Sequence, residues 1–188
     1  MFLEVAHSPS KAFDRLKETP ALRLAIALLL LRWTVTPATT VTNMYLNRYS
    51  MFIPPPFGID AHTYRFYEIF WYGPYGVLMM LAITLAMALI GRRLYHHPDI
   101  SFRRSFEIVS LSFFAPWVIS VPGDYVVTVL MHAQPAVLVA FHIAILAWEC
   151  WLLSVGYRRV FDLPWNRCVF LGWTAGALFV ALGGLLIR

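Results

Sequence analysis

Four ionisable side chains stand inside long apolar runs of this sequence, and they are its best candidates for chemistry. They are Arg32, Asp124, His142 and Glu149. A charged group near the centre of a bilayer costs a few kcal/mol on insertion scales, so it needs either a partner or a function. We expect these four residues to be buried, and at least one of them to contact another apolar segment through its side chain.

His142 and Glu149 are spaced two helical turns apart, which places them on nearly the same face of a helix. That face is expected to point into the protein interior. Arg32 and Glu149 are the best-matched opposite charges, because their depths differ by roughly 6 Å at 1.5 Å per residue, which long side chains can bridge. Two interpretations stay open: a structural contact that fixes helix packing, or a proton or solute path.

Histidines suggest two further chemistries, and neither is favoured. His96, His97 and Asp99 lie together in the stretch YHHPD, but a third ligand at useful spacing is missing nearby, so a solvated loop is preferred over a metal site. Haem ligation would need a second histidine at the depth of His142, and His132 lies nearer the edge of its segment. No Gly-rich phosphate loop, GxSxG elbow or HExxH motif is present. We therefore expect no enzyme activity, no catalytic residue, no metal and no cofactor.

The composition places these groups in a membrane. Of the 188 residues, 60% are hydrophobic and 13% are charged, and the mean hydropathy is +0.65. A soluble domain has roughly 25% charged residues. Cys150 and Cys168 both fall in apolar segments and form no CxxC pattern, which argues against a disulfide framework or a zinc site.

Five segments approach the length of about 20 apolar residues that a helix needs to cross a bilayer. They run from about Ala21 to Leu46, Phe70 to Ile90, Phe106 to Val121, Ala136 to Val155 and Cys168 to Ile187. The third contains Pro116, and the stretch VPGD at 121–124 is expected to break it. The following YVVTVLMH is too short to span and is interpreted as a re-entrant or interfacial turn of helix. The predicted fold is all-α: an interfacial helix over residues 1–20, then a bundle of five transmembrane helices over residues 21–188.

Lysine and arginine set the expected orientation, because cytoplasmic loops are rich in both. Eleven of them fall in the N-terminal segment and in the loops after the second and fourth spans, whereas three fall on the other side. This asymmetry predicts a multi-pass protein of the cell membrane with its N-terminus in the cytoplasm and its C-terminus outside. The net charge of +5 is therefore attributed to topology, and no nucleic-acid partner is expected.

The segment SPSKAFDRLKETP at 8–20 is predicted to form a helix on the membrane surface. Ser8 is a suitable N-cap and Pro9 a good first helical residue, and Phe13 and Leu16 share one face. The apolar run that follows is too long for the core of a cleavable signal peptide.

Similar short helices are expected before the third span, capped by Asp99 or Ser101, and before the fifth, capped by Asp162 with Pro164 in the first turn. Ordinary interface anchoring explains these basic and aromatic stretches. A sharper interpretation is a continuous basic face for anionic lipid or a protein partner. The residues of that face are Lys11, Arg15, Lys17, Arg92, Arg93, Arg103, Arg104, Arg158 and Arg159.

Two other features bear on partners. The proline-rich loop between the first two spans carries many tyrosines and tryptophans, which favours an aromatic belt at the outer interface over a ligand-binding lid. The fifth span contains GWTAG, and its GxxxG spacing allows a neighbouring helix to approach closely. Whether that neighbour belongs to the same chain or to another subunit stays open.

Three stretches resemble the YIP domain family of Ypt/Rab-interacting membrane proteins. SPSKAFDRLKETPALRLAIALLLL is similar to the opening segment of that family, and SFRRSFEIVSLSFFAPWVIS to its central element. The closing element resembles WECWLLSVGYRRVFDLPWNRCVFLGWTAGAL. The matching residues in the central and closing elements are Ser101, Phe102, Ser105, Pro116, Trp148, Leu152, Gly156, Val160, Leu163 and Arg167.

The resemblance implies five spans, a cytoplasmic N-terminus and no enzyme activity, and it links the chain to proteins of vesicle traffic and membrane shaping. Two functions are carried forward. The first is a non-catalytic membrane protein that organises membrane lipids or partner proteins through its basic cytoplasmic face, as a homo-oligomer or in a larger complex. The alternative is a small permease or transporter subunit that uses the intramembrane ionisable residues.

Overall fold

The computed structural model describes residues 2–46, 55, 58–127 and 135–186. These residues form helices and no strand, so the predicted all-α fold is confirmed. In chain order the helices are α1 (Phe2–His7), α2 (Pro9–Glu18), α3 (Leu22–Thr36), the π-helix η1 (Pro37–Val41), α4 (Thr42–Leu46), α5 (Ala61–Arg93), α6 (Phe102–Tyr125), α7 (Pro135–Phe161) and α8 (Trp165–Leu186).

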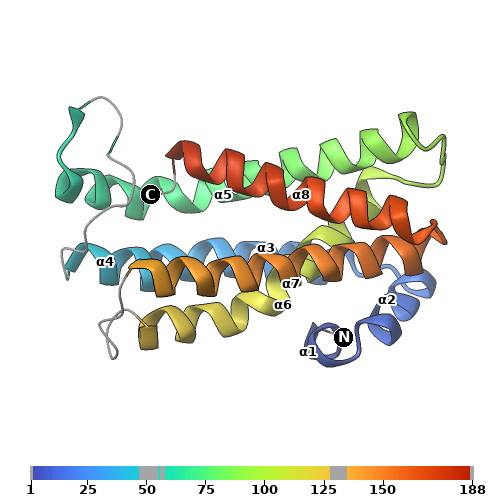
Figure 1. The fold of residues 1–188 in the computed structure, drawn as a ribbon, viewed down its shortest axis with the longest axis horizontal. Helices are drawn as coiled ribbons and strands as arrows, with labels where there is room; N and C mark the ends of the chain where they lie inside the picture. Colours follow the sequence, from blue (N-terminus) through green and yellow to red (C-terminus); the bar gives the residue numbers. More distant parts are fainter. Residues whose placement is uncertain (1, 47–54, 56–57, 128–134, 187–188) are drawn as a thin grey trace.

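Five helical segments are long and apolar enough to cross a membrane, as the sequence predicted. They are Leu22–Leu46, Ala61–Arg93, Phe102–Tyr125, Ala136–Phe161 and Trp165–Leu185. All five run along the long axis of the molecule, with α1 and α2 at one end (Figure 1). We call the end that carries α2 and the α5–α6 and α7–α8 connections the basic end. The opposite end, where α4 ends and α7 begins, is the far end.

α6 is the central helix of the bundle. In its most apolar stretch 72% of the residues are buried, compared with at most 39% in the other four spans. It packs against α1, α3, α5 and α7. Ser105, Glu107 and Phe113 are all fully buried although they lie on different sides of the helix. A helix that is buried all round belongs in the core of a bundle, and the remaining spans are arranged around this one.

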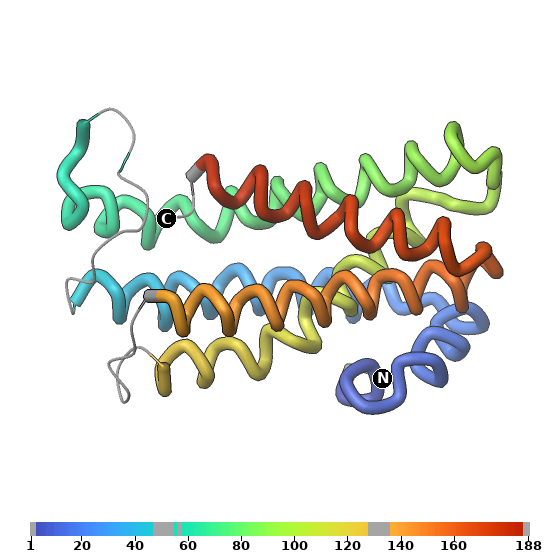
Figure 2. Tube along the Cα trace, viewed as in Figure 1, coloured from blue at the N-terminus to red at the C-terminus, as the bar shows by residue number. Residues whose placement is uncertain are grey.

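The expected break at 121–124 is wrong. α6 continues through Pro116, Pro122 and Gly123 to Tyr125. Figure 2 shows that its first half crosses the bundle obliquely and its second half follows the long axis. Proline removes one backbone donor and bends a helix, and here the helix changes direction without ending. The stretch YVVTVLMH, which we expected to form a separate short helix, lies mostly at 128–134, outside the described residues.

α2 matches the predicted N-terminal helix and begins with Pro9 after Ser8. Its apolar face covers the bundle, because Phe13 and Leu16 are fully buried. A Cβ added at Gly156 of α7 would lie 3.1 Å from the Phe13 ring. The absence of a side chain at that position therefore lets Phe13 pack tightly on α7.

The short helices expected before the third and fifth spans are not separate elements. The first of them forms the start of α6, where the Ser101 side chain accepts a hydrogen bond from the Arg104 backbone N–H at 3.2 Å. Asp162 is not a helix cap. It adopts a left-handed φ of 54° in the turn between α7 and α8, and its carboxylate accepts a hydrogen bond from Lys17. Asp162 therefore links the α7–α8 turn to α2.

α5 begins nine residues before the predicted start of the second span. The Asp60 carboxylate caps it by accepting a hydrogen bond from the Thr63 backbone N–H at 3.0 Å. The hydrogen bonds from Thr63 hold the pKa of the Asp60 carboxyl below its usual value. The aromatic stretch expected to lie in the external loop therefore forms the first turns of a long helix.

The two glycines of the GxxxG motif, Gly172 and Gly176 of α8, contact α7 of the same chain, which answers the question left open by the sequence. A Cβ at Gly172 would lie 2.4 Å from the Cys150 carbonyl oxygen, and one at Gly176 would lie 2.3 Å from the Cys150 sulfur. Both distances are far below van der Waals contact, so α8 approaches α7 at a separation that only glycine permits.

We predict that Gly172→Ala lowers the unfolding free energy of the purified protein by about 1–3 kcal/mol, because an extra carbon clashes with the α7 backbone. The thermal midpoint should fall accordingly. Gly184→Ala is the matched control, since a Cβ there meets nothing within 4 Å. Differential scanning fluorimetry in mild detergent measures both. Equal midpoints for the two variants would show that the close α7–α8 contact is not needed.

Candidate functional site

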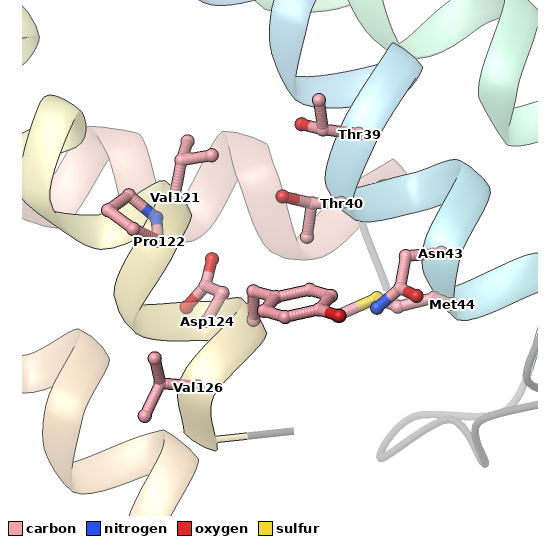
Figure 3. Close-up of a pocket in the computed structure, with 9 residues that line it drawn as sticks. Thr39, Thr40, Asn43, Met44, Val121, Pro122, Asp124 and Val126 are labelled. Carbon is pink, nitrogen blue, oxygen red and sulfur yellow. The ribbon is translucent and has the colours of Figure 1, made fainter. Parts of the chain in front are cut away.

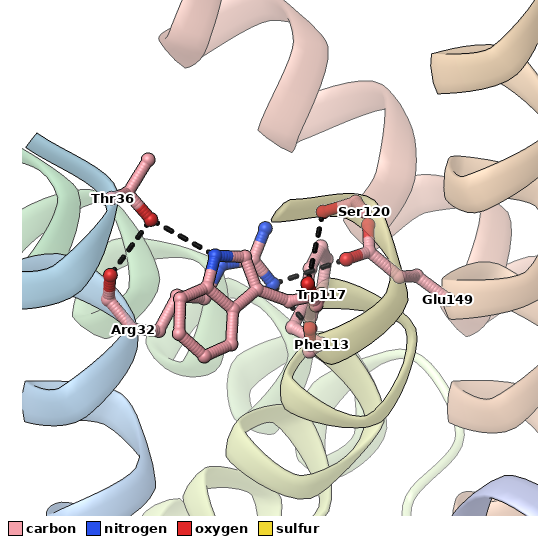
Figure 4. Close-up of polar contacts among 6 residues, drawn as sticks. All are labelled: Arg32, Thr36, Phe113, Trp117, Ser120 and Glu149. Atoms are coloured by element: carbon pink, nitrogen blue, oxygen red, sulfur yellow. Dashed lines mark hydrogen bonds and ion pairs between the residues drawn. The ribbon is translucent and has the colours of Figure 1, made fainter. Parts of the chain in front are cut away.

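Arg32 of α3 lies in the interior of the bundle, where it is 9% exposed. Its Nη1 donates hydrogen bonds to the Phe113 carbonyl oxygen of α6 and, at 3.0 Å, to Glu149 Oε1 of α7 (Figure 4). Three aromatic rings surround the guanidinium carbon, with centroids 5.4–5.6 Å away on Trp33, Phe113 and Phe179. One arginine therefore joins α3, α6, α7 and α8.

The predicted ion pair of Arg32 with Glu149 is present. Glu149 is 2% exposed, so its carboxylate has no access to solvent and depends on the guanidinium. Breaking a buried pair by removing one partner costs about 3–5 kcal/mol, because the remaining charge is left uncompensated. The extended arginine side chain covers the offset in depth that we inferred from the sequence.

A polar link between α3 and α6 lies one turn further along. The indole Nε1 of Trp117 donates to Thr36 Oγ1 at 2.9 Å, and this hydroxyl donates to the Arg32 carbonyl oxygen at 2.8 Å (Figure 4). Directly after it, Pro37 opens the π-helix η1, and π-helical turns occur frequently at functional sites.

Asp124 and His142 form a second contact between spans. His142 Nε2 on α7 lies 3.1 Å from Asp124 Oδ1 on α6. The Asp124 side chain is 11% exposed and the His142 side chain 48% exposed. The expectation that His142 faces the interior is therefore wrong in part: the ring contacts α6 along one edge and leaves the rest at the surface. The first turns of α7 are mostly exposed, whereas the turns that follow Trp148 are covered by α2, α6 and α8.

Arg65 and Glu68 form an ion pair that the sequence analysis missed. Both lie in the first turns of α5, with side chains 6% and 0% exposed and a distance of 2.5 Å between Nη1 and Oε2. Both residues precede Phe70, where the second span was expected to begin, so they fall in the stretch assigned to the loop between the first two spans. The i,i+3 spacing of opposite charges was the signal that could have revealed it.

A pocket of about 400 Å³ opens at the far end, between the first span and the end of α6. Figure 3 shows Thr40 and Asn43 on one wall, with Asp124 and Val126 on the other. Met44, Val121, Pro122 and Tyr125 complete most of the lining, and the surface that faces the cavity is almost entirely carbon. Helix irregularities flank the pocket on both sides, η1 on the first span and Pro122 on α6.

The basic end holds α2 in place with part of its charge. Arg104 Nη1 donates to the Leu16 carbonyl oxygen at 2.8 Å and to the buried Glu107 at 3.1 Å. Its Nη2 donates to the Lys17 carbonyl oxygen at 3.1 Å. Arg104 thus satisfies carbonyls at the C-terminal end of α2, and it points inward rather than to the surface on which we placed it.

The other residues of the predicted basic face are exposed. Arg15 pairs with Glu4 at 2.9 Å, Lys17 with Asp162, Arg103 with Glu107 at 3.5 Å and Arg159 with Asp14 at 3.8 Å. Arg158 lies over the Trp165 ring at 5.6 Å. Lys11, Arg92 and Arg93 are exposed and make no ion pair among the described residues. These three side chains remain available for a ligand at the basic end.

Metal coordination has no candidate in the part of the chain that the structure describes, since no group of three or more His, Cys, Asp or Glu side chains lies close together there. His96 and His97 lie in the α5–α6 connection. His97 stacks edge-on against Phe161 with centroids 6.1 Å apart. Cys150 and Cys168 are both buried and free.

The fold and the buried ion pairs define a polytopic α-helical membrane protein. The family model of the Yip1 domain matches residues 3–187, essentially the whole chain. The chain belongs to the Yip1 domain family, as the three sequence elements indicated. No curated protein and no solved structure matches it.

We predict that Glu149→Gln lowers the unfolding free energy by about 3 kcal/mol, because it leaves the Arg32 charge buried without a counter-ion. The double variant Arg32→Met/Glu149→Met should recover most of that loss, since it removes both charges and keeps the volume. Arg103→Gln is the surface control and should cost less than about 1 kcal/mol. Chemical or thermal unfolding in detergent measures all three, and a double variant as unstable as the single one would contradict a purely structural role.

Proposed function

We propose that this Yip1-family protein is a non-catalytic membrane scaffold that gathers anionic lipids, and through them partner proteins, at its basic end. The observation that supports this proposal is the division of charge at that end. Arg104, Lys17 and Arg159 are engaged in fixing α2 to the bundle. Exposed Lys11, Arg92 and Arg93 have no counter-ion among the residues that the structure describes.

The physical basis is the negative surface potential of the cytoplasmic leaflet, which attracts each nearby Lys or Arg by about 1 kcal/mol. Three such residues supply about 3 kcal/mol, or roughly a hundredfold in lipid affinity. The exposed aromatic residues Phe102 and Trp165 lie at the same end and are suited to the headgroup region. The contacts that fix α2 to the bundle hold Lys11 at the same end as Arg92 and Arg93 at the end of α5.

A second candidate function, that of a small permease or transporter subunit, is favoured by the pocket at Asp124. Irregular helices at membrane depth often line transport sites, and here η1 and the bent α6 both border the cavity. Because the two sites lie at opposite ends of the bundle, they can be tested independently.

The scaffold proposal predicts that the triple variant Lys11→Gln/Arg92→Gln/Arg93→Gln retains much less phosphatidylglycerol than the native protein. The matched control Lys11→Arg/Arg92→Lys/Arg93→Lys preserves the charge and should behave as native. Native mass spectrometry of protein extracted into mild detergent counts the bound lipids, with phosphatidylcholine as the uncharged comparison. The same phosphatidylglycerol count for all three proteins would contradict the proposal.

The proposed orientation, with the basic end in the cytoplasm, is tested by thiol accessibility. In a background with Cys150 and Cys168 replaced by alanine, a cysteine at Arg93 should resist a membrane-impermeant maleimide in intact cells. A cysteine at Ile59, at the far end, should react. Labelling of both positions in permeabilised cells is the control, and the reverse pattern would show that the basic end faces outward.

A further inference from the structure

Arg167 is an exposed cation that is positioned by an aromatic ring and not by a carboxylate. It lies in the first turn of α8, and its Cζ lies over the Tyr95 ring of the α5–α6 connection, 5.1 Å from the centroid. No carboxylate pairs with it among the residues that the structure describes. A guanidinium over an aromatic face keeps the N–H groups at its edge free to donate. Arg167 therefore presents oriented donors to a ligand that the described residues do not supply.

The surface that follows Arg167 along α8 is apolar and exposed. Phe170 comes one turn later, is half exposed, and contacts the same Tyr95 ring edge-on with centroids 6.5 Å apart. Trp173 is also more than half exposed. At 1.5 Å per residue, these two positions lie about 4.5 and 9 Å further along the helix axis than Arg167. A cation at the end of the bundle is thus followed by exposed rings that extend toward the middle of the span.

A second arginine–aromatic pair at the basic end lacks this apolar continuation. Arg158 of α7 lies over the Trp165 ring at 5.6 Å, and it too pairs with no carboxylate among the described residues. One turn along α8 from Trp165 is Cys168, which is fully buried. The two pairs therefore carry the same charge and a similar ring, and they differ in the exposed Phe170 that follows Arg167.

The ligand class that fits the Arg167 surface is a phospholipid with a net negative headgroup. A guanidinium binds phosphate oxygens through two parallel N–H···O bonds, and exposed rings beside it suit an acyl chain. Basic surfaces between transmembrane helices on the cytoplasmic side bind anionic headgroups in this way. Arg93 is exposed and lies two residues before Tyr95 in the chain. Its positive charge disfavours a headgroup that carries an ammonium, because like charges repel.

We propose that Arg167, Tyr95 and Phe170 form a binding site for one anionic phospholipid where α5 ends and α8 begins (Figure 1). The phosphodiester oxygens accept hydrogen bonds from the Arg167 guanidinium, which the Tyr95 ring holds in place. One acyl chain lies along Phe170. This site deepens the proposed scaffold function and rests on it for an anionic leaflet at the basic end. It adds a single defined lipid to the general attraction exerted by the other exposed basic side chains.

Native mass spectrometry of the full chain, titrated with phosphatidylglycerol in mild detergent, gives the dissociation constant of the first lipid bound. Phosphatidylcholine with the same acyl chains and glycerol phosphate, the soluble headgroup, are the comparisons. We expect phosphatidylglycerol to bind more tightly than phosphatidylcholine, and glycerol phosphate at the same concentration not to displace it. Equal affinity for the two lipids would contradict an anionic site. Displacement by glycerol phosphate would show that the site takes a free phosphate, and would overturn the assignment to a lipid.

Arg167→Gln should weaken binding of the first phosphatidylglycerol at least about tenfold, which corresponds to about 1.4 kcal/mol. Phe170→Ala keeps the charge and should also weaken it, because the acyl chain loses its contact. Arg158→Gln is the matched control, since it removes the same charge from the other arginine–aromatic pair, and it should bind the first lipid as native. An unchanged constant in Arg167→Gln, or an equal loss in Arg158→Gln, would overturn the proposal.

The binding site and the scaffold proposal fail in different ways. The triple variant Lys11→Gln/Arg92→Gln/Arg93→Gln should lose the lipids that bind after the first. If it loses none while Arg167→Gln loses the first lipid, the scaffold proposal fails and the binding site is supported. If the triple variant loses lipids while Arg167→Gln binds as native, the binding site alone is wrong.

Discussion

The guanidinium of Arg32 is the constraint on which the rest of the bundle depends. A charge at this depth cannot be hydrated by bulk water, so the chain has to bring anionic and dipolar groups to it. Glu149 provides the charge, the Phe113 carbonyl a dipole, and three aromatic faces close the remaining directions. These groups come from four helices, and their convergence fixes how α3, α6, α7 and α8 are rotated. A shift of any one helix along its axis would separate a group from the charge.

Close helix approach makes this convergence possible. At Gly73 a Cβ would lie 2.6 Å from the Trp33 carbonyl oxygen, and at Gly76 one would overlap the Trp33 ring. Glycine therefore lets α5 press against the residue next to Arg32, while Gly172 and Gly176 do the same for α8 against α7. Pro37 lacks a backbone N–H and frees the Trp33 carbonyl from its helical bond, which explains why the irregular η1 begins at that point.

The fold class and the Arg32–Glu149 ion pair could be predicted from the sequence, whereas the local geometry of the helices could not. The depths of Arg32 and Glu149 could be counted along the apolar runs. A charge in hydrocarbon needs an opposite charge at a similar depth, and these two residues were the best match. The start of α5 was misjudged because Arg65 and Glu68 look like loop residues until each neutralises the other. Pro122 was taken as a helix end, although in a crowded bundle neighbouring helices hold a bent helix together. The half-exposed position of His142 depends on which turns of α7 are covered by other helices. This packing cannot be predicted from the sequence of α7 alone.

The two ends of the bundle differ in where their charged side chains lie and in how well α7 is covered. At the basic end α2 covers α7, Phe13 packs against Gly156, and most charges lie at the surface where water and headgroups solvate them. At the far end the first turns of α7 are largely exposed, whereas Arg65 and Glu68 form a buried ion pair and the buried Asp124 lies beside His142. Stability is lowest where buried apolar contacts are fewest, so we expect the far end to open more readily than the basic end. The basic end and the pocket at the far end are thus built from the same helices, and the Arg32–Glu149 pair lies between them.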